Sequence, residues 1–90
     1  MSEIDTTLGE RENSYGDFFS QSNITQRLKH VMFDTPNWEH LSADKKEALE
    51  MIVLKIGRLL NGNPAHQDSW HDISGYARLV EQSLASIDCD

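Results

Sequence analysis

The stretch "SADKKEALEMIVLKIGRLLNGNP", Ser42 to Pro64, carries the strongest helical signal in this chain of 90 residues. Large apolar residues recur in it at intervals of three and four, the spacing that places side chains on one face of an α-helix. They are Leu49, Ile52, Val53, Ile56, Leu59 and Leu60. Ser42 is a favourable N-cap, and Asn61 or Gly62 offers a left-handed cap before Pro64. We therefore predict a helix over about residues 43–60.

A second helical pattern lies upstream of this stretch. Ile24, Leu28, Val31 and Met32 are spaced as i, i+4, i+7 and i+8, and Phe18 and Phe19 extend the stripe towards the N-terminus. Pro36 ends the pattern, because proline lacks an amide proton and disfavours helical geometry in the residue before it. The pattern predicts a helix over about residues 17–33, with Asp17 as its N-cap.

A third pattern follows the turn residues "NGNP". Its apolar stripe consists of Trp70, Ile73, Ala77, Val80 and Leu84. The stripe predicts a buried helix face over about residues 69–86, with Asp68 as the N-cap. Gly75 in the interior costs about 1 kcal/mol relative to alanine, which indicates close approach of a neighbouring helix or a ligand at that position.

The order of these patterns predicts an all-α fold. No segment alternates apolar and polar residues as a half-buried strand does. Residues 1–14 are polar and acidic and predict a flexible N-terminal arm. Residues 15–87 then form a single domain of three helices, the last two a hairpin joined by a short loop.

Composition restricts the partners and the location. The formal net charge of −7 argues against a nucleic-acid backbone or an anionic membrane as the main partner. One cysteine, Cys89, excludes an intramolecular disulfide framework and a cysteine-based zinc site. The chain has neither a secretory signal nor an apolar run long enough to span a bilayer, so we expect a cytoplasmic protein. Its thin core makes a homodimer a natural source of extra stability.

Acidic pairs occur on the second and third predicted helices. Glu47 and Glu50 are three residues apart, and Asp68 and Asp72 are four apart. Oxygen ligands on two adjacent helices suit magnesium, which prefers hard ligands and retains several waters. Spacing alone favours a plainer interpretation, in which the glutamates are solvated first-turn acids and Asp68 is a cap. The register of the hairpin does not bring the four carboxylates together within one chain, although a dimer could.

Basic and aromatic residues form the other candidate site. Lys55 and Arg58 lie three apart on one helix face, where they could hold a phosphate. The alternative is an ion pair with Asp72 across the hairpin. Trp70 and Tyr76 could stack on a base, but aromatic residues in an apolar stripe more often belong to a core.

Three motifs carry a family resemblance: "YGDF", "KIGRLLNG" and "DSWHDISGYA". With them the chain resembles a family of small phage and prophage proteins of uncharacterised function. Its second half is more distantly similar to phage nucleotide-modification-associated domains and to MazG-like all-α nucleoside triphosphate pyrophosphohydrolases. Those enzymes hold magnesium with an E-x-x-E pair on one helix and an E-x-x-D pair on the next. Glu47 and Glu50 match the first pair, whereas Asp68 and Asp72 depart from the second.

The resemblance implies a small phage-type protein, in a bacterial host cell, that binds nucleotide phosphates with magnesium. It leaves open whether the protein also hydrolyses them. The candidate residues are Glu47, Glu50 and Asp72 for the metal, Asp72 and Glu50 for catalysis, and Lys55, Arg58 and Tyr76 for the phosphates. A magnesium ion would polarise the phosphoryl oxygens while a carboxylate positions the attacking water. The alternative hypothesis is a non-catalytic acidic interaction or inhibitor protein that binds a host protein.

Overall fold

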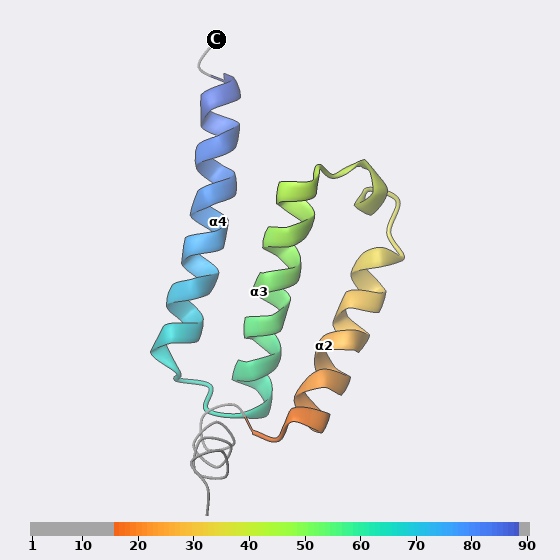
Figure 1. Cartoon of the computed structure of the whole chain (residues 1–90), viewed down its shortest axis with the longest axis vertical. Helices are drawn as coiled ribbons and strands as arrows, with labels where there is room; N and C mark the ends of the chain where they lie inside the picture. The colour runs from red at the N-terminus through yellow and green to blue at the C-terminus, as the bar shows by residue number, and fades with distance from the viewer. Residues whose placement is uncertain (1–15, 89–90) are drawn as a thin grey trace, which may run out of the picture.

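The computed structural model describes residues 16–88, and these contain helices and no strands. The helices are α2 (Phe18–Phe33), the short 3-10 helix η1 (Trp38–His40), α3 (Ala43–Asn61) and α4 (Gln67–Asp88) (Figure 1). The all-α prediction with three principal helices is confirmed, and their bounds agree with the predicted ranges to within about two residues, the usual uncertainty of helix ends. The predicted N-terminal arm lies outside the described residues.

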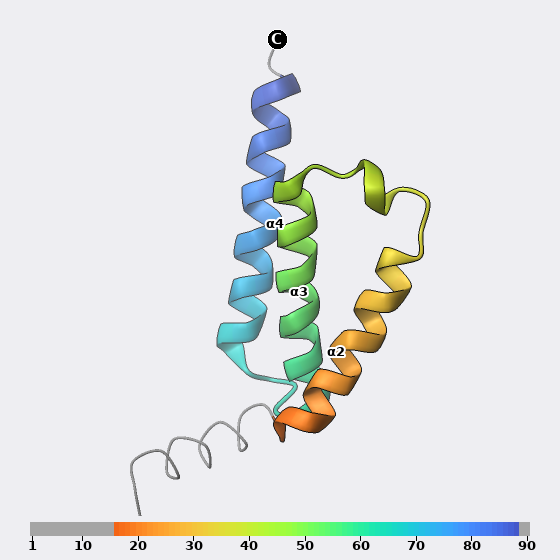
Figure 2. The same ribbon diagram turned by 45° about the vertical axis from the view of Figure 1, so that its right-hand side comes forward.

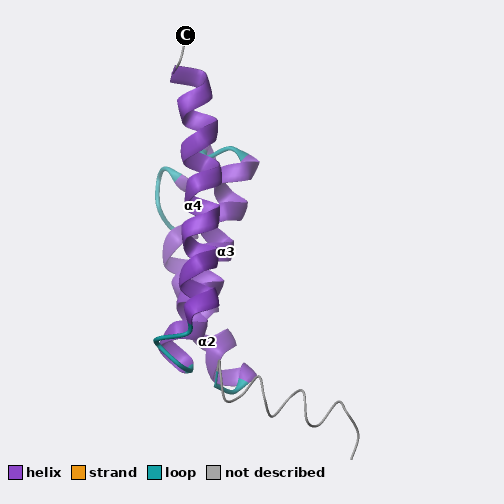
Figure 3. Ribbon diagram, turned by 90° about the vertical axis from the view of Figure 1, so that its left-hand side faces the viewer, coloured by secondary structure: helices purple, strands orange, loops and turns teal. Residues whose placement is uncertain are grey.

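Helix α3 is the central element of an open layer. It lies between α2 and α4, and its contacts with these two helices are the main packing interactions of the described chain (Figures 1 and 2). Seen from the side, the three labelled helices overlap one behind another (Figure 3). The helices therefore form a single layer with two broad faces.

The core of this layer is small. Among the described side chains, the buried apolar ones are Ala48, Val53 and Leu59, all on α3. The predicted core is wrong in several places, since these members of the predicted stripes are exposed: Val31, Leu49, Leu60, Ala77 and Leu84. Phe18 and Phe19 at the start of α2 are exposed, and so is Trp70, which leaves 56% of its surface accessible. The apolar period had indicated the correct helices, but a single layer cannot bury every apolar stripe.

The crossing of α2 and α3 depends on a glycine that the sequence analysis did not single out. Thr25 and Gln21 of α2 are buried against Gly57 of α3, where a Cβ atom would collide with Oγ1 of Thr25. The close helix approach predicted at Gly75 is wrong, since nothing lies within 4 Å of a Cβ built there. Gly57, with no side chain, permits the two backbones to approach.

The start of α2 is fixed to the end of α3. Asp17 caps α2 as predicted, because its carboxylate accepts a hydrogen bond of 2.8 Å from the amide of Ser20, which also lowers the pKa of this carboxyl. The side-chain amide of Asn61 donates to the carbonyl of Asp17 at 2.9 Å. Gly16 adopts a φ of 77° against Asn61. The predicted left-handed cap of α3 is wrong: Gly62 has a φ of −126°.

The start of α4 also differs from its prediction. The helix begins at Gln67, so Asp68 lies inside the first turn and is not the cap. His66 takes the capping role, because its Nδ1 accepts a hydrogen bond of 3.3 Å from the backbone amide of Ser69. The same Nδ1 lies 2.9 Å from the hydroxyl of Ser69. Trp70 donates its indole N–H to the carbonyl of Pro64 at 2.9 Å, so this exposed ring fastens the loop between α3 and α4.

The first prediction concerns the glycine at the α2–α3 crossing. Gly57→Ala should lower the free energy of unfolding by about 1–3 kcal/mol, because the new methyl group overpacks the contact with Thr25. In a Thr25→Ala background the collision is absent, and the same substitution should stabilise α3 by up to about 1 kcal/mol through helix propensity. Urea denaturation of the four proteins measures this change of sign. Equal effects of Gly57→Ala in both backgrounds would contradict the assignment of Gly57 as a contact glycine.

The second prediction separates the two candidate caps of α4. His66→Ala should cost about 1 kcal/mol of stability, and His66→Asn should retain most of it, because asparagine can accept the same amide proton. Asp68→Ala should cost less than about 0.5 kcal/mol, since only the interaction with the helix dipole is lost. Urea midpoints measure all three changes. A larger loss for Asp68→Ala than for His66→Ala would restore Asp68 as the cap.

Candidate functional site

The antiparallel packing of α3 and α4 brings Lys55 and Asp72 together. The Nζ of Lys55 lies 3.0 Å from a carboxylate oxygen of Asp72. The lysine side chain is 11% exposed, whereas that of Asp72 is 41% exposed. The ion pair considered in the sequence analysis is therefore confirmed, and its acidic partner remains open to solvent.

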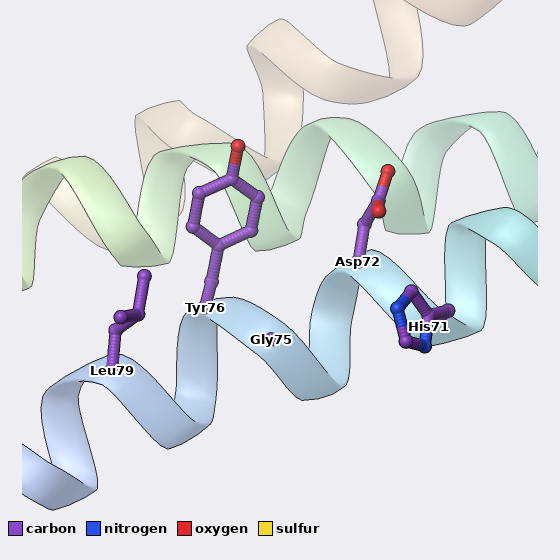
Figure 4. Close-up of a pocket in the computed structure, with 5 residues that line it drawn as sticks. All are labelled: His71, Asp72, Gly75, Tyr76 and Leu79. Atoms are coloured by element: carbon purple, nitrogen blue, oxygen red, sulfur yellow. The ribbon is translucent and has the colours of Figure 1, made fainter.

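Asp72 borders an open cavity along α4. The cavity has a volume of about 390 Å³ and is lined by His71, Asp72, Gly75, Tyr76 and Leu79. Asp72, Tyr76 and Leu79 point from α4 towards α3 (Figure 4). The absence of a side chain at Gly75 leaves the cavity accessible along the helix surface.

A neighbouring cavity continues this one towards the start of α3. It measures about 230 Å³ and shares Tyr76 and Leu79 with the first, while Asp44 and Glu47 lie on its α3 side. We call the two cavities together the side groove. The side groove thus has Asp72 at one end, Tyr76 at its middle, and Asp44 and Glu47 at the other end.

Several cations act on the carboxylate of Asp72. The hydrogen bond from Lys55 holds the pKa of Asp72 below its ordinary value, against a smaller opposing effect of desolvation. The positive charges of Lys55, His71 and Arg58 lower this pKa further. Three groups that carry or can acquire positive charge therefore surround one carboxylate, in a chain whose net charge is −7. Of these groups, His71 lines the cavity with Asp72, while Lys55 and Arg58 belong to α3 and are not among the residues that line it.

The two glutamates of the E-x-x-E pair lie on different sides of α3. Glu47 lines the side groove with residues of α4. Glu50 instead lies 3.5 Å from Nζ of Lys29 on α2, in an ion pair at the other helix contact. Within residues 16–88, no group of three or more histidine, cysteine, aspartate or glutamate side chains is arranged to hold a metal ion. The predicted ligands Glu47, Glu50 and Asp72 therefore do not form one cluster in a single chain.

Two residues of the side groove were not selected from the sequence. Asp44 lines the groove beside Glu47, and a hydrogen bond with the Ser42 side chain lowers the pKa of its carboxyl. His71 lies in the cavity beside Asp72. Their spacing from Glu47 and Tyr76, three and five residues, was the available signal, but it is common in helices.

Comparison with known families gives a match over residues 3–84 to the family described as "Domain of unknown function (DUF6378)". No curated protein and no solved structure matches the chain. In the described part of the chain, every helix is too short or too polar to cross a membrane.

The third prediction concerns the Lys55–Asp72 ion pair. Asp72→Asn should lower the urea midpoint at neutral pH, because the nearly buried ammonium of Lys55 loses its charged partner. The pKa of Asp72 is lowered by folding, so its stabilisation is complete above about pH 4 and is lost as the pH falls through the folded-state pKa. The difference from wild type should therefore shrink below pH 4, and also at high salt.

Asp68→Asn is the matched control, since this exposed carboxylate lies on the same helix. It should change the midpoint less than Asp72→Asn does at pH 7 and low salt. If Asp72→Asn left both the midpoint and its acid dependence as in wild type, the ion pair would contribute nothing to the fold.

Proposed function

The chain belongs to the DUF6378 family, and we propose that it binds a phosphate-bearing ligand, of which a nucleotide is the best candidate, in the side groove. The observation that carries this proposal is the concentration of cationic groups around Asp72. Lys55, Arg58 and His71 all act on its carboxylate beside an open cavity.

The phosphate end of the ligand would lie at the Asp72 end of the side groove, near Lys55 and Arg58, whose charges act on Asp72 although neither residue lines the cavity. Lys55 offers an ammonium held in place by Asp72, and a lysine with a fixed position loses less rotamer entropy on binding than a free one. Arg58 supplies a planar guanidinium that matches phosphate oxygens in pairs. In this proposal Asp72 positions Lys55 and balances its positive charge when no ligand is bound.

The base end of the ligand would lie against Tyr76. The phenol ring is half-buried and lines both cavities of the side groove, so one of its faces is available along the groove. Aromatic rings stack on nucleobases with little sequence preference, typically gaining about 1–3 kcal/mol per base. The larger cavity, at about 390 Å³, lies in the range of small-molecule sites.

Magnesium enters this proposal only together with the ligand. The protein residues do not fit a preformed magnesium site, because the predicted ligands lie apart and Glu50 is paired with Lys29. Magnesium bound to nucleotide phosphates commonly uses only one or two protein carboxylates and several waters. Asp72, at the phosphate end of the side groove, is the carboxylate that would hold it, whereas Glu47 and Asp44 line the opposite end, beyond Tyr76. We assign no hydrolytic step.

The fourth prediction tests this proposal by binding. Isothermal titration of the full chain with nucleoside triphosphates, pyrophosphate and phosphate, each with and without magnesium, should show saturable binding that weakens with salt. Arg58→Gln should weaken it about 10-fold or more, the effect expected for a lost charged hydrogen bond. Tyr76→Ala should weaken nucleotides more than pyrophosphate, because only nucleotides carry a base.

Lys29→Gln is the matched control, because it removes one positive charge at the α2 contact away from the side groove. It should change the affinity by less than about 3-fold, as expected for a distant, screened charge. Absence of binding to every phosphate ligand, or equal losses for Lys29→Gln and Arg58→Gln, would end the proposal. The acidic interaction protein that binds a host protein would then be the remaining hypothesis.

A further inference from the structure

The layer of helices has one face on which exposed apolar side chains gather. On α3, the exposed Leu49 and Leu60 and the half-buried Ile56 are spaced by seven and four residues, so at 100° per residue they form one stripe. On α4, Ala77 and Leu84 are likewise seven residues apart.

A cavity shared by α3 and α4 connects the two stripes. It measures about 290 Å³, and its lining includes Leu49 and Ile52 of α3 together with Ala77 and Val80 of α4. Lys45 is the charged residue of this lining, and no carboxylate takes part. The side groove, by contrast, is lined by His71 and Asp72 of α4 and by Asp44 and Glu47 of α3. These residues are rotated about their helix axes away from the two apolar stripes.

Helix α2 extends the same side. On α2, a rotation about the helix axis leads from Thr25, at the contact with α3, to the exposed Val31. On α3, a rotation in the same sense leads from Gly57, at the contact with α2, to Leu49. In antiparallel helices an equal sense of rotation leads to the same face of the layer. We call this side the apolar face, with members Val31, Leu49, Ile56, Leu60, Ala77 and Leu84.

We propose that the apolar face of one chain packs against the apolar face of a second copy of this chain, which makes a two-fold symmetric dimer. The face joins all three helices, so the dimer would be a two-layer helical structure with its core between the layers. This inference concerns a surface on the other side of the layer from the proposed phosphate site, and it does not depend on that site.

The area of the face suits such a dimer. Helix α3 has 19 residues and is about 28 Å long, and three helices about 9 Å apart span about 27 Å. The product is about 760 Å², close to the roughly 800 Å² that each partner contributes to a standard stable interface.

The distribution of charge favours a second copy in spite of the net charge of −7. Two acidic chains repel one another, so a self-interface must keep carboxylates away from its centre. The members of the apolar face are uncharged, Glu81 lies beside Ala77 and Leu84 on α4, away from the central helix, and the carboxylates that pair with lysines, Asp72 and Glu50, belong to the helix contacts. Packing two copies would also supply the core that Ala48, Val53 and Leu59 cannot provide alone.

The arrangement has a consequence for the side groove. With the apolar faces together, the side grooves of the two copies open on the outer surfaces of the dimer. Carboxylates of the two chains therefore do not meet in this dimer, which does not complete the Glu47, Glu50 and Asp72 set across its interface.

The fifth prediction is tested by sedimentation equilibrium of the full chain between about 1 and 200 µM. The wild-type protein should behave as a dimer of twice the 10.3 kDa chain mass, with a urea midpoint that rises with protein concentration. Leu60→Lys should weaken dimerisation about 30-fold or more, as expected when a charge is buried without a partner in an apolar interface. Leu79→Lys makes the same charge change on the side-groove face at nearly equal exposure, 63% against 67%, and should leave the dissociation constant within about 3-fold.

Val31→Lys, on the exposed side of α2, is the second test variant and should dissociate the dimer as Leu60→Lys does. Circular dichroism confirms that each dissociated variant remains helical. A wild-type protein that is monomeric at 200 µM with a concentration-independent midpoint would overturn the proposal. So would a Leu79→Lys effect as large as that of Leu60→Lys, which would place the interface on the other face.

Discussion

Helix α3 must pack on two opposite sides at once, and the other features of this structure depend on that constraint. One side carries Gly57, where the missing side chain lets Thr25 of α2 come into contact. The opposite side carries Lys55, which reaches Asp72 of α4. Because the principal contacts all involve α3, the helices spread into a layer rather than close into a bundle. A layer has two faces, and the chain gives them different chemistry.

The division between these faces explains the separation of the two proposed surfaces. A ligand site needs polar groups and access to solvent, whereas a subunit interface needs apolar area without uncompensated charge. The side groove has the first character, with Asp72 at one end and Glu47 at the other. The apolar face has the second. Each can therefore change by mutation without the other, which is the reason the matched variants at Leu60 and Leu79 are informative.

Periodicity in the sequence predicted the three helices and the capping role of Asp17, because both depend on local spacing and backbone chemistry. The hairpin register also predicted the approach of Lys55 to Asp72. Burial was predicted less well, since an apolar stripe identifies a face but not what covers it. Trp70 shows this most clearly: it belongs to an apolar stripe, yet it lies at the surface and fastens a loop through its indole N–H.

The candidate site was predicted only in part from the sequence, again because spacing identifies a helix face but not what covers it. The residues on α4 and their lysine partner depend on a two-helix register, which sequence spacing describes. Glu50 was misgrouped with Glu47, because a three-residue spacing covers about 60° of rotation and the two side chains lie near the boundary between the α2 and α4 contacts. His66 was missed as a cap because histidine is not among the usual capping residues.

The central claim is that one face of the layer is covered and the other is open, and methyl NMR with a soluble paramagnetic probe tests it most directly. Leu60 and Leu79 are similarly exposed in a single chain, so a monomer should show equal broadening of their methyl signals. The account predicts strong broadening for Leu79 and protection for Leu60 and Leu49. Equal broadening of Leu60 and Leu79 at concentrations up to about 200 µM, above the micromolar range of moderate complexes, would contradict it.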